Sequence, residues 1–562
     1  MKKQQIIKMT CWCLIILIPL SELLVGYDSS DIGFILNQYK FINADYNTIY
    51  LPLLLTDVIG SVFLNIFKCF SMPEYLCFEV LWALCIYYLC FLSYKVYKKY
   101  YENELILPAL VIAVIFAKTN LNFFMYNTTV AVFSLTALYF FVIAVNDRKN
   151  IYLVISVFFL CLSVLSKLSA AIQIIMYLTL FYDFYIKKDR KHFSRQILSC
   201  LAGGAAGIVI CGIIISASCG MSEYFGMIRD MFIYAGNSGD GHTVKNMLLI
   251  NIKGVMHGVI WLGIAFCLVC LSHIKPLAKL TKPAGIGLII IVSVYTVVGF
   301  FAAGISENVL TLYQSTWKFF EVIAIVTALM YICVFMIMKN KEYSHEYKIL
   351  VLSAALITCS MPIGSNVGIR HICNESFFVI PFIAVAIRNT VFSGKVKATT
   401  DIKKYIVLSF MIYMAAVSLK QSFYRSCYYQ ENGIKIAADE NITQLRYIKS
   451  DQSEYELLEE LLAFLSEKEY DRAVVAGNFP IINYLSGIKP GIDSCGGWIE
   501  TDYVTATDIE TDLYNYMPVI ITSDSGYSVD TEKNRTIKNF INSNKYMEVF
   551  HNEKFTVYSF EK

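Results

Sequence analysis

The 562-residue sequence is poor in charged residues, which make up 16% of the chain. A soluble domain has about a quarter charged residues and about half apolar residues, whereas 57% of the residues here are hydrophobic. This composition excludes an intrinsically disordered chain and a secreted disulfide scaffold. A net charge of only +3 also excludes a strongly basic nucleic-acid-binding protein.

Three patterns that would indicate other functions are also missing. There is no Gly-rich phosphate loop, so we expect no nucleotide site. There is no tandem repeat. Many transporters consist of two similar halves, but residues 1–210 do not resemble residues 211–420 here.

The 17 cysteines lie mostly in apolar runs, where they act as small hydrophobic residues. The CxxC pair of Cys267 and Cys270 has no second pair nearby, so it is not expected to bind metal.

The hydrophobic residues come in blocks long enough to cross a membrane. A membrane-spanning helix needs about 20 mainly apolar residues. Hydropathy predicts about thirteen crossings, and therefore a mainly α, polytopic transmembrane helical bundle. The candidate spans centre on residues 9–26, 75–94, 105–117, 128–145, 151–166, 169–186, 197–218, 254–271, 284–304, 318–338, 349–364, 376–391 and 405–420.

The chain divides into a transmembrane domain, residues 1–420, and a C-terminal domain of soluble composition, residues 421–562. Lys and Arg concentrate in alternate loops, so the positive-inside rule predicts a cytoplasmic N-terminus and an extracytoplasmic C-terminal domain. The apolar, Tyr- and Ile-rich composition of the membrane portion is typical of a protein of a bacterial plasma membrane. Cys427 and Cys495 then both lie outside, and the sequence does not decide whether they pair.

The C-terminal domain is predicted to be a small α/β domain. A helix is expected over 454–468, strands over 472–477 and 518–524, a second helix over 531–542, and a closing hairpin over 546–560. We interpret this domain as a lid or an acceptor-docking module rather than an independent catalytic domain.

The first outer loop, residues 27–73, begins with a polar cluster at the membrane edge. Asp28 and Asp31 are three residues apart and would share one face of a helical turn. They could orient a metal or take a proton from an acceptor hydroxyl. The alternative is that they cap the following helix, because Asp and Ser are favoured at that position. Residues 35–42 and 50–67 are expected to form helices lying in the membrane interface.

Polar residues of later outer segments are the other candidates. Asn127, together with Asn120 and Asn122, lies near the mouth of the third and fourth spans. Lys167 lies in an apolar region, where a charge is expensive and often functional. The alternative is a lysine that snorkels from a helix end. His242 belongs to a polar, Gly-containing outer loop, 219–252.

Arg370 and His371 precede one of the last spans. A guanidinium can hold a phosphate with two parallel hydrogen bonds. The alternative for Arg370 is a simple interfacial anchor.

Several of these residues resemble motifs of the glycosyltransferase-C superfamily. This superfamily includes protein O-mannosyltransferases and lipid A aminoarabinose transferases. Asp31-Ile32-Gly33-Phe34 resembles its entry to the first outer loop, and Lys167 within Leu162–Ala170 is similar to its Leu-x-Lys corner. Arg370-His371, before Phe377–Ala384, resembles a segment of a late span. One departure is Asn127, which stands where many members have a second acid.

The resemblance implies a membrane glycosyltransferase that uses a polyprenyl-phosphate-linked sugar and inverts the anomeric carbon. It implies Asp31, with Asp28 as the alternate, as the catalytic acid or base, and it leaves metal dependence and cofactors undecided. It implies that the donor phosphate is held by Arg370, Lys167 and His371, with Asn127 and His242 lining the site. The acceptor can be a glycan, a lipid or a protein, and no nucleic acid is involved.

Three alternatives stay open at this point. A transporter or flippase of lipid-linked saccharides can have as many spans. A polymerase or ligase of surface polysaccharide is also multispan, but it typically has its large outer loop late in the chain. The third alternative is a non-enzymatic scaffold for envelope assembly.

Overall fold

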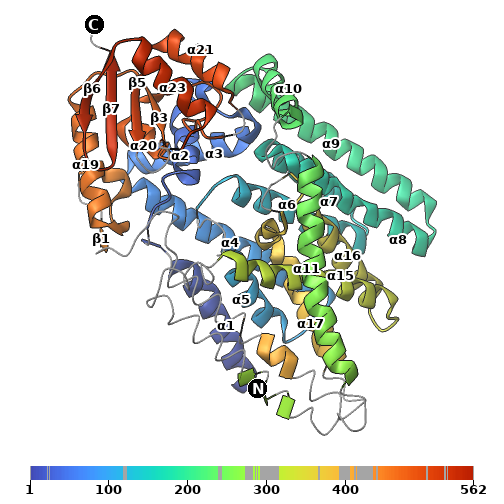
Figure 1. Cartoon of the computed structure of the whole chain (residues 1–562). Coiled ribbons are helices and arrows are strands. Elements are labelled where there is room, and N and C mark those ends of the chain that lie inside the picture. Colours follow the sequence, from blue (N-terminus) through green and yellow to red (C-terminus); the bar gives the residue numbers. More distant parts are fainter. Residues whose placement is uncertain are drawn as a thin grey trace.

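The chain folds into a helical domain that has a small domain of strands and helices at one end (Figure 1). The expected mainly α fold with a C-terminal α/β domain is thereby confirmed. The computed structural model describes residues 2–21, 23–24, 26–117, 123–237, 244–271, 283–284, 286–287, 289–290, 316–364, 368–391, 405–410, 413, 435–437, 441–501, 504–523, 527 and 529–560. The helical domain contains α1 (Lys2–Leu20), α2 (Asp31–Phe41), α3 (Leu54–Cys69), α4 (Glu74–Tyr100), α5 (Ile106–Ala117), α6 (Tyr126–Asn146), α7 (Ile151–Ser166), α8 (Thr179–Lys187), α9 (Arg190–Ser218), α10 (Met221–Asn237), α11 (Val244–Leu271), α15 (Thr316–Lys339), α16 (His345–Ser360) and α17 (Val379–Val391).

Most apolar blocks of the sequence form helices. Within the described ranges, eight helical segments are long and apolar enough to cross a membrane, and three shorter apolar helices accompany them. The predicted spans at 284–304 and 405–420 lie largely outside the described residues, so the total of about thirteen stays a prediction. One of the eight segments is Leu51–Cys69, which includes α3. We had expected this stretch to lie in the interface, and by length and composition it is also able to cross.

Small residues allow α7 and α9 to pack closely, as the GxxxG spacing of Gly203 and Gly207 indicates. A Cβ atom on Gly203 would lie 2.5 Å from the carbonyl oxygen of Val154. One on Gly207 would lie 2.5 Å from the Sγ of Cys161. Side chains at these two positions would therefore push the helices apart.

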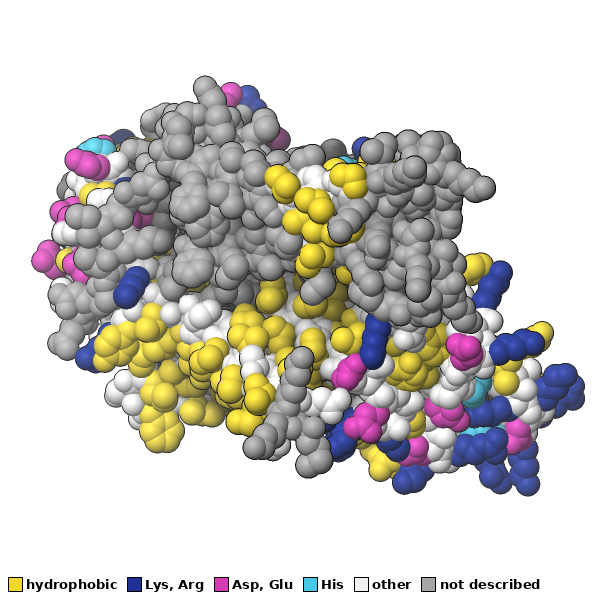
Figure 2. Space-filling model, turned by 90° about the horizontal axis from the view of Figure 1, so that it is seen from below, with side chains coloured by type: hydrophobic (Ala, Val, Ile, Leu, Met, Phe, Trp, Pro, Cys, Tyr) yellow, Lys and Arg dark blue, Asp and Glu magenta, His cyan; other side chains and the backbone are white. Residues whose placement is uncertain are grey.

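Basic residues gather at one end of the helical domain. Lys99, near the end of α4, forms an ion pair with Asp147, which follows α6. The adjacent Arg148 lies 3.6 Å from Asp189, the N-cap of α9. Figure 2 shows basic side chains collected on one side of the face seen from below, beside a hydrophobic surface. The sequence around these helix ends contributes Lys95, Lys98, Lys149, Lys187, Lys188, Arg190 and Lys191.

The C-terminal domain contacts the opposite end of α4. The hydroxyl of Tyr484 in that domain donates a hydrogen bond to Glu74, the first residue of α4. Because α4 has 27 residues, its ends are roughly 40 Å apart, more than the hydrocarbon thickness of a bilayer. The basic end and the α/β domain therefore lie about one membrane thickness apart.

A five-stranded mixed sheet forms the centre of the C-terminal domain, in the order β4-β3-β5-β7-β6. Strand β3 pairs in parallel with β4 and β5, and the hairpin of β6 and β7 adds antiparallel to β5. The expected strands, helices and hairpin are all present, whereas β1, β2, α20, β4 and α21 were not predicted. The elements are α19 (Gln452–Ser466), β3 (Arg472–Ala476), α20 (Ile481–Ser486), β4 (Lys489–Pro490), α21 (Ala506–Tyr516), β5 (Val519–Ser523), α23 (Glu532–Ser543), β6 (Tyr546–His551) and β7 (Phe555–Phe560), and β1 (Lys435–Ala437) and β2 (Lys449–Asp451) pair separately.

The two faces of this sheet pack against different partners, as alternation along β3 requires. Val475 belongs to a hydrophobic cluster shared with α19, α20 and the first outer loop. Its neighbour Val474 belongs to a second cluster, formed with α21 and α23. One face of the sheet is thus covered by α21 and α23, and the other packs with α19, α20 and the first outer loop.

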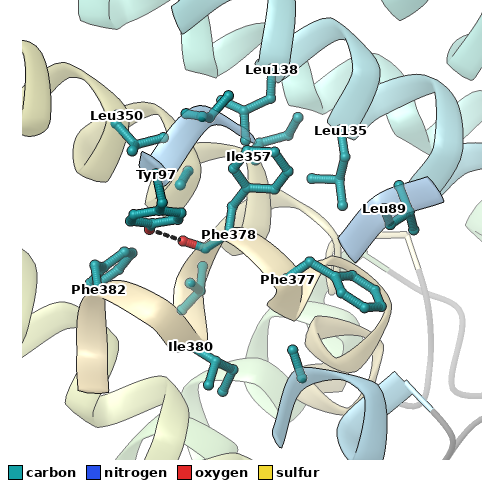
Figure 3. Packing of buried hydrophobic residues seen from close by; sticks show 14 of the residues in the cluster. Leu89, Tyr97, Leu135, Leu138, Leu350, Ile357, Phe377, Phe378, Ile380 and Phe382 are labelled. Atoms are coloured by element: carbon teal, nitrogen blue, oxygen red, sulfur yellow. Dashed lines mark hydrogen bonds between the residues drawn. The ribbon is translucent and has the colours of Figure 1, made fainter. Parts of the chain in front are cut away.

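Two long 3₁₀ helices, η3 (Leu168–Leu178) and η5 (Gly368–Phe378), lie within the helical domain. Each has 11 residues and runs directly into an α-helix, α8 and α17 respectively. Figure 3 shows how the end of η5 is anchored: the hydroxyl of Tyr97 on α4 donates to the carbonyl of Phe378 at 2.5 Å. Ser93 of α4 donates to the carbonyl of Phe377 at 2.7 Å. These bonds satisfy carbonyls where the helix changes type.

Candidate active site

The two aspartates of the first outer loop have different environments. The Oδ1 of Asp28 accepts hydrogen bonds from the backbone N–H of Ser30 at 2.8 Å and of Ile32 at 3.4 Å. It also accepts one from the hydroxyl of Ser30 at 3.1 Å. Asp28 therefore satisfies donors at the start of α2, which is the capping interpretation of this residue.

Asp31, the first residue of α2, is half-buried and makes no hydrogen bond or ion pair with a described residue. Burial, and after it the charge of Asp28, raises the pKa of Asp31 to about 7. A carboxyl with such a pKa exchanges a proton near neutral pH, as a general acid or base must. The two aspartates therefore differ: Asp28 holds the start of α2, whereas Asp31 makes no such contact with a described residue.

The C-terminal domain packs along α2, next to Asp31. The N–H of Ile481, which begins α20, donates to the carbonyl of Ser29 at 3.2 Å. A Cβ atom on Gly33 would lie 2.5 Å from the same nitrogen, so only glycine permits this approach. The buried amide of Asn37 donates to the carbonyls of Pro480 at 2.8 Å and of Gly496 at 3.0 Å.

A second polar group lies where α6 begins and α7 ends. The Nζ of Lys167, which follows the last residue of α7, donates to the Oδ1 of Asn127 at 3.3 Å. The same ammonium lies 4.8 Å from the ring centroid of Tyr126. Lys167 is half-buried and therefore does not simply extend into solvent. Two residues from the sequence prediction, Asn127 and Lys167, are thus brought together.

The late-span residues lie at the start of η5. His371 is buried there. Arg370 is half-buried, with its guanidinium carbon 6.0 Å from the centroid of the Phe320 ring on α15. The loop before η5 also comes close, since a Cβ on Gly364 would lie 2.4 Å from the Cβ of Ser169. The structure therefore places η5 beside the start of η3.

Asp31 does not touch these basic residues. Described contacts lead from Asp28, whose N–H donates to the hydroxyl of Tyr75 at 3.1 Å, to the ring of Phe123, 5.0 Å from that of Tyr75. The carbonyl of Phe123 accepts a hydrogen bond from Thr128, the neighbour of Asn127, at 3.0 Å. The acid and the basic residues are two separate groups, joined by this packed segment.

Some predicted residues fall outside the described ranges, namely His242, Asn120, Asn122 and Cys427. Cys495 is a buried free thiol, and Cys267 and Cys270 are exposed free thiols on α11. Among the described residues, no group of three or more His, Cys, Asp or Glu side chains is placed to hold a metal ion. In particular, the Oδ1 of Asn127 is occupied by Lys167. The described donor atoms therefore do not fit the metal site that the sequence resemblance left open.

Glu375 on η5 was not predicted. It is fully buried, and its Oε1 accepts hydrogen bonds from the hydroxyl of Ser134 at 2.6 Å and the amide of Gln173 at 2.7 Å. The signal for it was available, because an acidic residue inside an apolar span is expensive and usually functional. The sequence prediction ended at His371, four residues earlier.

No family model matches the chain, and no curated protein sequence matches it. Two solved structures, both of ArnT from Cupriavidus metallidurans, are similar over nearly its whole length. The crystal structure of the apo state is 12% identical, covers 99% of this chain and 98% of its own, and has a TM-score of 0.43. The crystal structure bound to undecaprenyl phosphate is 12% identical, with 98% and 97% covered and a TM-score of 0.38.

Proposed function

We propose that this chain is a membrane glycosyltransferase that moves a sugar from a polyprenyl-phosphate donor to an acceptor hydroxyl. The observation that carries the proposal is Asp31. It is a half-buried carboxyl with a pKa of about 7 and without a hydrogen-bonding partner among the described residues. It lies next to the junction between the C-terminal domain and the helical domain. An acid or base must lie near such a water-facing junction if it is to meet an acceptor that arrives from the water.

The basic residues support the donor half of the reaction. A polyprenyl-phosphate sugar has its lipid in the bilayer and its phosphate near the surface, so its site needs cationic groups at the ends of apolar helices. Lys167, Arg370 and His371 all lie at the starts of the 3₁₀ helices η3 and η5. In the proposed site they hold the donor phosphate and stabilise the charge that grows on it as it leaves.

The proposed reaction is one in-line displacement. The acceptor oxygen forms a bond to the anomeric carbon while the bond from that carbon to the phosphate oxygen breaks. Asp31, in its ionised form, takes the proton of the acceptor hydroxyl, and the polyprenyl phosphate leaves with the electron pair. Because attack and departure occur on opposite faces, the configuration inverts. Asp28 contributes by holding the start of α2 and by raising the pKa of Asp31.

We also propose that the basic end of the helical domain faces the cytoplasm of a bacterial plasma membrane. Lysine and arginine side chains concentrate there, and the positive-inside rule assigns such ends to the cytoplasm. The C-terminal domain, at the other end of α4, is then extracytoplasmic. Sugar transfer takes place on the outer face, where the acceptor is a glycan, a lipid or a protein.

The test is sugar transfer in membranes that contain the overproduced protein and a panel of undecaprenyl-phosphate-linked sugars. Asp31→Asn keeps the shape of the side chain but cannot accept the proton, so we expect a loss of about 100-fold or more in rate. The matched control is Asp471→Asn, at an exposed carboxylate on the surface of the C-terminal domain. It should leave the rate unchanged.

Full transfer by Asp31→Asn, at normal protein levels, would remove Asp31 from the mechanism. A wild-type protein that transfers no sugar, yet moves a lipid-linked saccharide across the membrane in vesicles, would instead favour the transporter alternative.

A further inference from the structure

The two 3₁₀ helices are unusual and lie beside the basic residues. Runs of 3₁₀ helix longer than three or four residues are uncommon, and such segments often mark a functional or strained site. Here η3 and η5 each have 11 residues. Lys167 immediately precedes η3, and Arg370 and His371 lie in the first turn of η5. The directions of all three basic side chains therefore depend on how these segments are wound.

Glu375 ties the two segments together. Its Oε1 accepts from the Nε2 of Gln173 in η3 at 2.7 Å, and from the hydroxyl of Ser134 in α6 at 2.6 Å. Both Glu375 and Gln173 are almost completely buried. A carboxylate is an expensive choice for a structural link at this depth, where Ser134 and Gln173 are neutral partners. Among the described residues, Glu375 has no cationic partner.

The far end of η5 is held independently. Tyr97 on α4 donates to the carbonyl of Phe378 (Figure 3), and Ser93 on the same helix donates to the carbonyl of Phe377. Glu375 is therefore the link between the fixed end of η5 and the end that carries Arg370. Loss of this link would remove the side-chain hydrogen bonds that tie η5 to η3 and α6, and would leave its first turns held by packing such as that of Ile369 against Gly254 of α11.

Rewinding into an α-helix would change the direction of the Arg370 side chain. A 3₁₀ helix turns by 120° per residue and an α-helix by 100°, so the side chain at Arg370 would rotate by about 100° relative to Glu375. The same change would also shorten this stretch by about 2.5 Å. Misplacement on that scale is enough to break a two-sided grip on a phosphate.

We propose that Glu375 is a positioning residue for the donor phosphate. By bonding to Gln173 and Ser134, it holds η5 in the 3₁₀ form and so fixes the directions of Arg370 and His371 at the start of that helix. This inference rests on the proposed function, because it assigns Glu375 a role in the same phosphate site.

The experiment measures the binding of undecaprenyl phosphate to the purified full-length protein in detergent, from the shift in thermal unfolding as the lipid is titrated. Undecaprenol, which has the same chain without the phosphate, is titrated in parallel. Glu375→Ala should weaken the phosphate-dependent binding by about tenfold or more and leave the undecaprenol response unchanged. A variant that was only unstable would change its response to both lipids.

Two further variants complete the test. Glu375→Gln retains a carbonyl oxygen that can accept both hydrogen bonds, so its affinity should stay within about threefold of wild type. Ser376→Ala removes a neighbouring buried hydroxyl whose bonds go to Cys373 and Ala113. It should bind like wild type.

Wild-type affinity in Glu375→Ala, or a Glu375→Gln variant as weak as Glu375→Ala, would overturn the role of these hydrogen bonds. A wild-type protein that responds equally to the two lipids would contradict the proposed function itself, which is a separate result.

Discussion

The N–H of Ile481 donates a hydrogen bond to the carbonyl of Ser29 at 3.2 Å, which joins the C-terminal domain to the turn that carries Asp31. The two residues are far apart in the sequence, because Ser29 lies near the start of the chain and Ile481 lies in the C-terminal domain. Because of this contact, the environment of Asp31 is built by both ends of the chain. The C-terminal domain thus contacts the segment of the candidate site that carries Asp31.

The raised pKa of Asp31 predicts a pH dependence of activity. A base must be ionised, and burial shifts this ionisation upward to about pH 7. We therefore expect kcat/KM to be level above about pH 8 and to fall about tenfold per pH unit well below 7. The measurement is the pH profile of sugar transfer from pH 5 to 9. A profile that is flat down to pH 5 would contradict the assignment.

The same shift has a consequence for stability with the opposite sign. The pKa of Asp31 is raised from its ordinary value of 3.8 to about 7 in the folded protein. Between these two pH values the folded protein binds more protons at Asp31 than the unfolded chain does, so stability falls as the pH rises through this window. Asp31→Asn has no charge to bury. We expect it to unfold at a higher temperature than wild type at pH 8, with the difference disappearing near pH 4. Equal unfolding temperatures at pH 8 would count against a buried, ionisable Asp31.

Gly33 is predicted to be required for docking of the C-terminal domain. A methyl group there would meet the nitrogen of Ile481 at 2.5 Å, so Gly33→Ala should destabilise the protein by about 1–3 kcal/mol and reduce transfer. The control is Gly226→Ala on α10, where a Cβ would meet nothing within 4 Å. That change should be neutral or stabilise by about 0.5–1 kcal/mol. Thermal unfolding of both variants decides the matter, and equal effects would argue against the close contact.

Asn37 is predicted to hold the same junction through hydrogen bonds. Asn37→Ala would leave the buried carbonyls of Pro480 and Gly496 without this donor, at a cost of about 1–3 kcal/mol. We expect faster cleavage between the domains in limited proteolysis. Asn552→Ala is the control, because its amide bonds to Leu457 within the C-terminal domain. If both variants were cleaved at the same rate, Asn37 would have no special role in docking.

Asn127 is predicted to leave Lys167 free to change partners. An acid at this position would form an ion pair with Lys167, which Asn127 now contacts at 3.3 Å, and would compete with a phosphate. Asn127→Asp should therefore weaken undecaprenyl phosphate binding by about tenfold, whereas Asn127→Ala should stay within about threefold of wild type. A gain of activity with added divalent cations in Asn127→Asp would instead indicate that the position serves a metal.

Much of the fold was predictable because hydropathy and alternation are local. The apolar blocks at 75–94 and 128–145 became α4 and α6, and the buried runs at 472–477 and 518–524 became β3 and β5. Strand β4 escaped prediction because it has only two residues, Lys489 and Pro490. Its pairing comes from its neighbour β3 rather than from any pattern of its own.

The candidate site was predictable only in part. The sequence indicated Asp31 through the resemblance of Asp31–Phe34 to a family motif, and Lys167 because a charge in an apolar region is costly. It did not separate Asp28 from Asp31, since capping depends on which N–H groups each carboxylate meets in space. Glu375 was overlooked, although the same cost argument applies to it.

By itself, the sequence determined that this chain is a helical membrane protein with a small α/β domain after it, because burial in lipid and in a sheet each leave a periodic or continuous apolar pattern. Only the tertiary structure decided that the C-terminal domain covers α2, that Lys167 meets Asn127, and that η3 and η5 are wound as 3₁₀ helices bridged by Glu375. Those features arise from hydrogen bonds between segments distant in the chain. The free energy of such bonds depends on desolvation and geometry that no local pattern encodes.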